Sequence, residues 1–121
     1  MSFPAAWLER IESAGLLAES VEPGPALDCS EKEFQAAVVK LAKAKGWLAY
    51  HTHDSRRSEK GFPDLVLIRD GKLLIVELKT ESGRVSPEQT VWLCALVACG
   101  VDVRTWRPSM WESIAETLKG G

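Results

Sequence analysis

Two carboxylates and a lysine are the residues of this chain whose types and spacing could do chemistry. They are Asp64, Glu77 and Lys79. Carboxylates that face each other repel unless a proton or a cation lies between them. A divalent metal ion with oxygen ligands is the natural occupant, and a lysine beside it could orient a water molecule or stabilise negative charge on a phosphate. The alternative is an exposed hairpin end with an ordinary Glu–Lys neighbourhood.

The stretch that carries these residues predicts a hairpin. Two apolar runs, residues 64–69 and 72–79, are separated by Asp70-Gly71. An Asp-Gly pair in this place predicts a two-residue turn with both residues at positive φ. That turn places Asp64 directly opposite Glu77, with Lys79 on the same face, so all three should meet at the open end of the hairpin.

A first-helix glutamate is a further candidate for the same site. Ser30 and Glu33 match a capping box that starts a helix, which explains Glu33 as a structural residue. Glu31 lies three residues before Phe34 and seven before Val38, so it extends the buried stripe of that helix. A carboxylate aimed at the core needs a reason, and a metal site supplies one. We therefore favour Glu31, with Glu33 as the alternative.

A second capped helix follows the hairpin. Residues 86–89, Ser-Pro-Glu-Gln, place Ser86 as N-cap and Gln89 at the third helical position, and Gly100 ends the helix. Capping explains Gln89, yet the start of a helix also suits phosphate, so a role in the site stays open. Cys94 and Cys99 lie in the same helix, and we expect them to pack in the core.

A polar loop at residues 54–60 leads into residues 61–64, the corner that ends at Asp64. The side chains of this loop are suited to contacts with phosphate oxygens, although charged loops are usually just solvated. His51, at the end of the strand predicted for residues 47–52, should line the same cleft unless it is a structural histidine. A zinc pair of His51 and His53 lacks further ligands at a sensible spacing. The residues of this stretch that we predict to contact phosphate groups are His51, Ser55, Arg56, Arg57 and Lys60.

Composition limits the class of protein. The chain has 121 residues, enough for one domain, with hydrophobic and charged contents that are ordinary for a globular protein. No apolar run is long enough for a membrane span, and the N-terminus lacks a signal-peptide layout. Three cysteines without a CxxC pair fit a reduced, cytoplasmic setting. The net charge is −5 over residues 1–33 but +3 over the rest, so the body of the domain is mildly basic.

The remaining segments complete an α/β domain. We expect an N-terminal helix at 4–14, a connector at 15–29, a last strand at 101–106, and a final helix opened by a capping box at Ser109. The order predicts a mixed sheet of about four strands with helices on both faces. We divide the chain into residues 1–29, a helix and connector, and residues 30–121, the functional domain.

The whole series of motifs resembles one known family. Asp64 with Glu77-Leu78-Lys79 looks like the PD-(D/E)xK nuclease motif. The longer pattern resembles the VRR-NUC branch of that superfamily, in the stand-alone phage and bacterial type, over about residues 30–119. Its elements here are Gly61-Phe62-Pro63-Asp64, Glu77-Leu78-Lys79, Ser86-Pro87-Glu88-Gln89, Trp92, Gly100, Val103 and Arg107-Pro108.

The resemblance implies a restriction-endonuclease-like αβββαβ core and a Mg²⁺- or Mn²⁺-dependent DNA endonuclease. It implies metal ligation by Asp64, Glu77, the Leu78 carbonyl and Glu31, with Lys79 and Gln89 as catalytic residues. It also suggests a homodimer that cuts branched DNA as Holliday-junction resolvases do. A nuclease for flaps or ordinary duplex, and a catalytically silent DNA-binding module, are the alternatives.

Overall fold

A mixed four-stranded sheet forms the centre of the protein. The computed structural model describes residues 23–52 and 59–120. Strands follow one another in the sheet in chain order, with antiparallel pairing between the first three and parallel pairing between the last two. They are β1 (Leu48–His51), β2 (Leu65–Arg69), β3 (Lys72–Leu78) and β4 (Asp102–Trp106).

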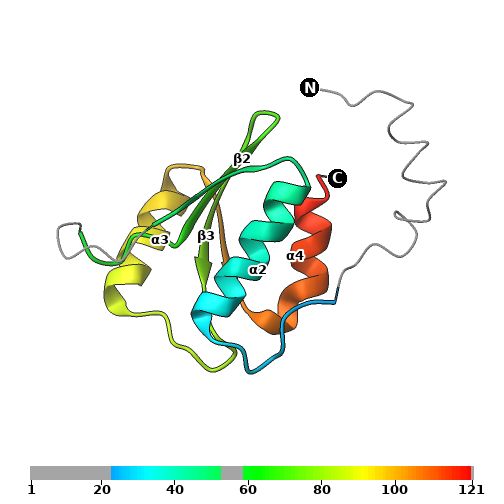
Figure 1. Cartoon of the computed structure of the whole chain (residues 1–121). Coiled ribbons are helices and arrows are strands. Elements are labelled where there is room, and N and C mark those ends of the chain that lie inside the picture. The colour runs from blue at the N-terminus through cyan, green and yellow to red at the C-terminus, as the bar shows by residue number, and fades with distance from the viewer. Residues whose placement is uncertain (1–22, 53–58, 121) are drawn as a thin grey trace.

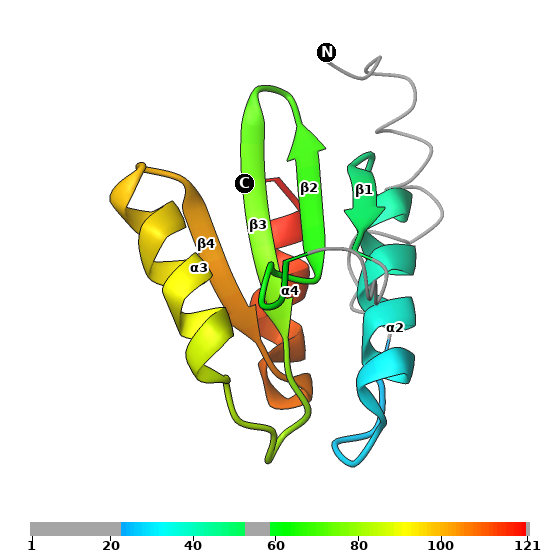
Figure 2. The same cartoon turned by 90° about the vertical axis from the view of Figure 1, so that its left-hand side faces the viewer.

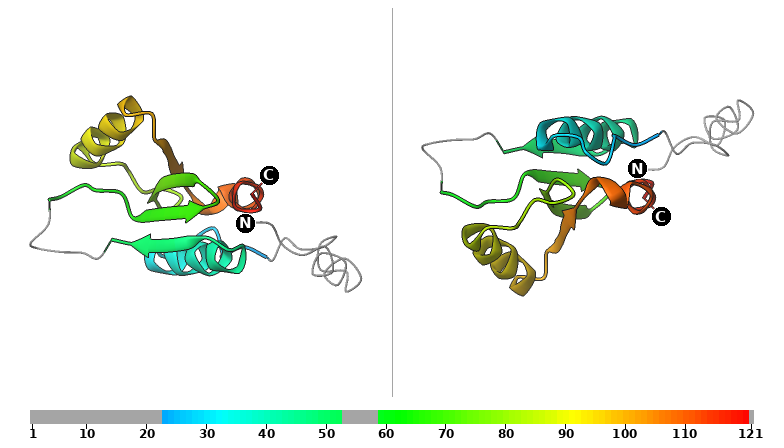
Figure 3. Two further views of the ribbon diagram at one scale, coloured as in Figure 1. Left: turned by 90° about the horizontal axis from the view of Figure 1, so that it is seen from above. Right: turned by 90° about the horizontal axis from the view of Figure 1, so that it is seen from below.

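Helices cover both faces of this sheet. They are α2 (Glu31–Ala44), α3 (Pro87–Ala98) and α4 (Trp111–Leu118), with a short 3₁₀ helix, η1 (Pro108–Met110), before α4. Helices α2 and α4 contact each other over one face, whereas α3 lies beside β4 on the opposite face (Figures 1, 2 and 3). The element order confirms the predicted αβββαβ core. The helix predicted at 4–14 lies outside the described residues.

The hairpin has the turn and register that its sequence predicts. Asp70 and Gly71 have φ values of 48° and 78°, which is the positive-φ pair of a type I′ turn. Arg69 pairs with Lys72, and the ladder continues to Leu65 opposite Val76. The next opposed positions are therefore 64 and 77, as expected. Strand β2 begins one residue later than predicted and β3 ends one residue earlier.

The core lies on the side of the sheet that α2 and α4 cover. Alternate residues of β2 and β3 point into it, including Leu65, Leu67, Leu74, Val76 and Leu78. Residues from α2 and α4 fill the opposite wall, including Phe34, Val38, Leu41, Ile114 and Leu118. The core therefore buries one face of the hairpin and leaves Glu77, which alternates with Val76 and Leu78, on the other.

Two expectations about the second half of the chain are wrong. Ser109 does not cap the last helix, since the N-cap of α4 is Met110 and has no side-chain cap. The Ser109 amide instead donates to Glu81 Oε2 at 2.9 Å, and residues 108–110 form the 3₁₀ turn η1. Cys94 and Cys99 are exposed rather than packed in the core. No residue of α3 is buried against the described part of the chain.

No helix within residues 23–52 and 59–120 is long and apolar enough to cross a membrane.

Candidate functional site

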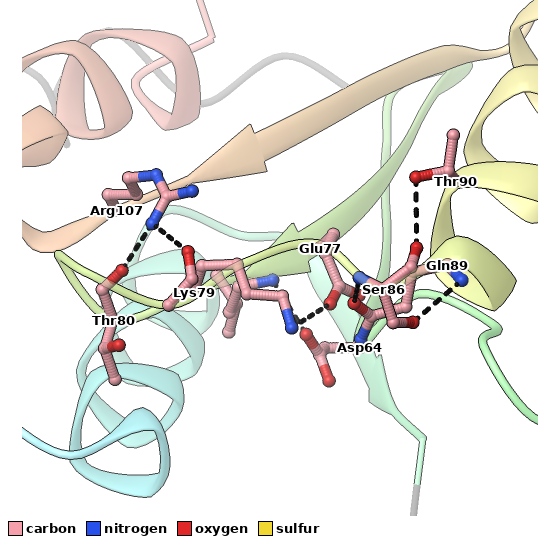
Figure 4. Close-up of polar contacts among 10 residues, drawn as sticks. Asp64, Glu77, Lys79, Thr80, Ser86, Gln89, Thr90 and Arg107 are labelled. Atoms are coloured by element: carbon pink, nitrogen blue, oxygen red, sulfur yellow. Dashed lines mark hydrogen bonds and ion pairs between the residues drawn. The ribbon is translucent and has the colours of Figure 1, made fainter.

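Asp64, Glu77 and Lys79 meet at the open end of the hairpin, as the register predicts (Figure 4). Asp64 Oδ2 accepts a hydrogen bond of 2.7 Å from the Leu78 amide, which fixes the carboxylate against β3. Lys79 Nζ lies 3.4 Å from Glu77 Oε2. The Lys79 amide donates to the Trp106 carbonyl at 3.0 Å, which extends the pairing of β3 with β4 by one residue. The backbone at Leu78 and Lys79 is therefore held in place by hydrogen bonds.

Glu77 is a buried carboxylate that its surroundings do not satisfy. Its side chain is fully buried, and neither oxygen has a hydrogen-bond partner among the described residues. Burial, followed by the negative charge of Asp64, raises the pKa of Glu77 to about 8, and Lys79 opposes this shift only in part. The Lys79 ammonium lies within ion-pair distance of the carboxylate, so it is a partner for the charged form but does not cancel the effect of burial. Such a group needs either a proton or a cation beside it.

The residues present suit a hard divalent cation with few protein ligands. Within the described ranges, no cluster of three or more His, Cys, Asp or Glu residues is close enough to hold a metal ion. Mg²⁺ commonly binds through one or two carboxylates and keeps several waters, so it does not need such a cluster. Asp64 and Glu77 supply that pair, and the uncompensated oxygens of Glu77 are available to it. The donor set therefore fits Mg²⁺ or Mn²⁺ better than zinc.

Glu31 and Glu33 differ in what surrounds them, although both lie in the first turn of α2. Glu33 completes the capping box: its Oε1 accepts from the Ser30 amide at 2.9 Å, and this hydrogen bond lowers its pKa. Glu31 has a raised pKa, first from desolvation and then from the charge of Asp64, while Lys79 lowers it. Glu31 is therefore the first-helix carboxylate that lies within electrostatic reach of the site.

Gln89 is held by its own helix. Its side-chain Oε1 accepts a hydrogen bond from the Ser86 backbone amide at 2.8 Å, and its backbone amide donates to Ser86 Oγ at 3.1 Å. This pair of hydrogen bonds is the predicted capping box (Figure 4). The cap uses the side-chain oxygen and leaves only the Nε2 group for any contact with the site.

Thr52 holds the corner that presents Asp64, a role that the sequence did not suggest. Its hydroxyl donates to the Pro63 carbonyl at 2.8 Å, and its amide donates to the Asp64 carbonyl at 2.8 Å. His51, the residue before it, is half-buried at the end of β1 opposite Leu65. A threonine at the end of a predicted strand that also carries a candidate site residue is a weak signal for such a role.

Arg107 holds the loop that follows Lys79, a second role that sequence analysis missed. Its Nη1 donates to the carbonyl of Thr80 at 2.6 Å (Figure 4). The same nitrogen donates to the carbonyl of Gly83 at 2.7 Å, with a longer contact of 3.3 Å to the carbonyl of Glu81. One guanidinium group thus donates hydrogen bonds to three carbonyls of a loop that lies 24 to 27 residues earlier in the sequence. The sequence shows Arg107 only as part of the family motif, because no local pattern predicts so distant a contact.

The loop that enters the Asp64 corner is attached to the first turns of α3. Gly61 has a φ of 99°, and a Cβ there would lie 2.7 Å from the Glu88 carbonyl oxygen. Trp92 Nε1 donates to the Lys60 carbonyl at 3.1 Å, and the rings of Phe62 and Trp92 meet edge to face at 5.3 Å. Lys60 itself is exposed. The predicted DNA contacts Ser55, Arg56 and Arg57 lie outside the described residues.

Comparison with known proteins identifies the family. The VRR-NUC domain matches residues 5–109, which is most of the chain. The chain belongs to the VRR-NUC domain family. The match begins within the segment that we predict as an N-terminal helix and connector, and the boundary at residues 29 and 30 stays a prediction. This VRR-NUC protein therefore carries a nuclease-type domain.

A solved structure described as a VRR-NUC domain shares the fold. It aligns with a TM-score of 0.61 and 22% identity, and the alignment covers 74% of this chain and 95% of that one. At this level of identity the likeness concerns the fold alone, and it confirms the expected restriction-endonuclease-like α/β architecture. No curated protein is significantly similar to this VRR-NUC chain.

Proposed function

We propose that this VRR-NUC protein is a metal-dependent DNA endonuclease that hydrolyses phosphodiester bonds. The observation that carries the proposal is Glu77, a fully buried carboxylate without a hydrogen-bond partner among the described residues, next to Asp64 and Lys79. A binding module would gain nothing from this buried carboxylate, because its burial beside Asp64 costs stability and Lys79 offsets that cost only in part. A nuclease gains a cation site at the reacting phosphate.

Mg²⁺ or Mn²⁺ would be held by Asp64 and Glu77, with the Leu78 carbonyl and Glu31 as further ligands, directly or through water. When bound, the ion would supply a water molecule of lowered pKa and would neutralise charge on the phosphate. Lys79, 3.4 Å from Glu77, would orient that water and stabilise the charge that develops on the phosphate. Gln89 would orient the water or the lysine through its Nε2 group.

DNA would approach over the loop that precedes the Asp64 corner. The proposed contacts to its backbone are His51, Ser55, Arg56, Arg57 and Lys60, because this stretch directly precedes the Asp64 corner in the sequence and three of its residues are basic. The excess of basic residues after residue 33 supports the same approach, and a reduced cytoplasmic compartment suits the free cysteines.

Branched DNA is the substrate that we favour. A domain of this size supports one site, so the paired cuts that resolve a four-way junction require two copies of the chain. The family resemblance to junction resolvases motivates this choice. Cutting of flaps or ordinary duplex by the same site is the alternative substrate class, and a catalytically silent DNA-binding module is the alternative from another class.

The decisive test is cleavage of four substrates: a four-way junction, a flap, a duplex and a single strand. Each is incubated with Mg²⁺ or Mn²⁺ and with wild-type protein or the Glu77→Ala variant. Paired symmetric cuts in the junction alone, absent from Glu77→Ala, are expected. Cuts in the flap or the duplex would support a nuclease and contradict the assignment as a junction resolvase. No metal-dependent cutting of any substrate, with binding retained, would replace the proposal by the silent module.

A further inference from the structure

The loop that follows Lys79, residues 80–83, has a cavity on one side and Arg107 on the other. The cavity has a volume of about 460 Å³, and residues 80–82 line it together with residues 27–29. Arg107 Nη1 lies within hydrogen-bond distance of the carbonyls of residues 80, 81 and 83, at 2.6 Å, 3.3 Å and 2.7 Å. The loop therefore borders a hollow where it faces the residues before α2, and its carbonyls are bound by the residue that follows β4.

A second contact ties this loop to the same segment of the chain. Glu81 Oε2 accepts a hydrogen bond of 2.9 Å from the Ser109 amide. Ser109 and Arg107 both lie between β4 and α4, so two groups of one short segment hold the loop. Arg107 has the larger part, because carbonyl oxygens that converge on one donor are left unsatisfied and repel one another when that donor is removed.

The loop folds back onto the side chain of Lys79. The Gly83 amide donates to the Thr80 carbonyl at 3.2 Å, which closes a turn. A Cβ on Gly83 would lie 3.6 Å from Lys79 Cδ and 2.9 Å from Thr80 Oγ1, so the backbone at Gly83 faces the aliphatic stem of the lysine. The lysine side chain is 11% exposed, and its ammonium lies 3.4 Å from Glu77 Oε2. The loop is thus one wall of the space that the lysine occupies.

A lysine depends on such a wall more than a shorter residue does. The Lys79 amide is hydrogen-bonded to the Trp106 carbonyl, which fixes the backbone but not the rotatable bonds of the side chain. Holding a lysine in one rotamer costs side-chain entropy, so the lysine stays in place only where packing encloses its stem. If the loop moved into the cavity, the stem would regain that freedom and the ammonium would spend less time beside Glu77.

We propose that Arg107 is a positioning residue for Lys79: by binding the loop carbonyls it holds Gly83 against the lysine stem and so keeps the ammonium beside Glu77. The effect on cleavage rests on the proposed function, whereas the placement of the side chain does not. DNA is the other partner that an arginine near the site could have. The Arg107 nitrogen that faces the loop is already used by carbonyls at 2.6 Å and 2.7 Å, and a phosphate would have to displace them.

The variant Arg107→Met separates the donors of Arg107 from its packing, because methionine keeps an unbranched apolar stem and removes every donor. Arg104→Met is the matched control: Arg104 lies three residues earlier, and its guanidinium pairs with Asp102 at 2.6 Å. Arg107→Gln also lacks the guanidinium and replaces Arg107→Met if that variant does not melt cooperatively. All variants are full-length chains, and thermal melts establish that each is folded.

The accessibility of Lys79 is measured first, without metal or DNA. Trace acetylation with acetic anhydride, read by mass spectrometry, reports how accessible each lysine amine is, and the exposed Lys40 of α2 is the internal standard. We expect the ratio of Lys79 to Lys40 acetylation to rise about tenfold in Arg107→Met, as for a segment that opens locally, and to be unchanged in Arg104→Met. Equal ratios in wild type and a folded Arg107 variant would overturn the inference.

Cleavage kinetics then test the consequence, on whichever of the four DNA substrates wild type cuts. Arg107→Met should lower kcat by about 10- to 100-fold, as expected for a misplaced catalytic group, with KM unchanged. A raised KM with a shallower salt dependence and unchanged kcat would mean that Arg107 contacts DNA instead. An accessible Lys79 with wild-type kcat would also contradict the positioning role. If wild type cuts none of the substrates while Lys79 becomes accessible in Arg107→Met, the placement of Lys79 by Arg107 is supported and the nuclease is contradicted.

Discussion

Helices α2 and α3 start alike and end up in opposite environments. Each begins with a serine whose hydroxyl caps the third helical residue, and in each that residue caps the serine amide in return. Helix α2 then buries Phe34 and Val38 and keeps charged residues outside, whereas α3 buries no residue and presents apolar ones. A capping box thus reports where a helix starts and carries no information about what its sides contact.

Helices α2 and α3 also differ in which first-turn residue the capping box uses. In α2 the cap occupies Glu33, so Glu31 is the carboxylate within reach of Asp64 and Lys79. In α3 the cap occupies Gln89, the residue that the family motif assigns to the site. The two helix starts therefore differ: the start of α2 places a carboxylate within electrostatic reach of Asp64, and the start of α3 lies against the loop at Gly61.

Glu77, the buried carboxylate beside Asp64, should give the largest effect. Its folded pKa of about 8 exceeds its ordinary value of 4.5, so the folded state retains a proton that the unfolded state releases. Stability of the metal-free protein should therefore fall as pH rises from about 4.5 to 8. Glu77→Gln should remove this loss and be more stable than wild type at pH 9, by on the order of a few kcal/mol, but not at pH 4.

Thermal melts in chelator at pH 4, 7 and 9 would measure this difference. Glu33→Gln is the matched control, because hydrogen bonding lowers the pKa of Glu33 and no gain at high pH is expected. Added Mn²⁺ should raise the melting temperature of wild type and not that of Glu77→Gln. Identical pH profiles for wild type and Glu77→Gln would contradict the account of Glu77 as a desolvated carboxylate.

The next effect should separate Glu31 from Glu33. Glu31→Gln should weaken Mn²⁺ binding by roughly 10- to 100-fold, as expected for a residue that supports a metal site. Glu33→Gln keeps the capping geometry and should leave the affinity unchanged. Titration calorimetry of both variants would decide, and a larger loss in Glu33→Gln would reverse the assignment of the two glutamates.

The attachment of the entry loop to α3 should be sensitive to Gly61. Gly61→Ala combines a positive φ with a Cβ placed 2.7 Å from the Glu88 backbone, so we expect a loss of stability of roughly 1–3 kcal/mol. Gly71→Ala is the control, because Gly71 also has positive φ but nothing within 4 Å of its Cβ position. Denaturant unfolding of both would isolate the contact. Equal losses would mean that the loop is not held against α3.

Gln89 should give the smallest change in stability and the sharpest information about α3. Gln89→Ala removes one capping interaction, with a loss of about 1 kcal/mol, whereas Gln89→Glu retains the capping box. If the Nε2 group acts in the site, Gln89→Glu should cut DNA more slowly at unchanged stability. Cleavage at the wild-type rate by this variant would leave Gln89 as a cap alone.

Much of the architecture could be predicted because its causes are local. The Asp70-Gly71 turn dictates the pairing of Asp64 with Glu77, and Ser30 and Ser86 mark the starts of their helices within a residue. Where local signals compete with distant groups, prediction failed. Ser109 has the sequence of a cap, yet Glu81 binds its amide and the chain turns as a 3₁₀ helix instead.

The sequence by itself determined the order of elements, the register of the hairpin and the three residues at its open end, since these depend on neighbours along the chain. Only the tertiary structure decided that Glu77 has no hydrogen-bond partner among the described residues. It also decided that the charge of Asp64 raises the pKa of Glu31 rather than that of Glu33, and that Arg107 binds the carbonyls of the Thr80–Gly83 loop. It also placed Cys94 and Cys99 on the surface. Desolvation, long-range charge and exposure depend on groups that the fold brings together, so no local pattern reports them.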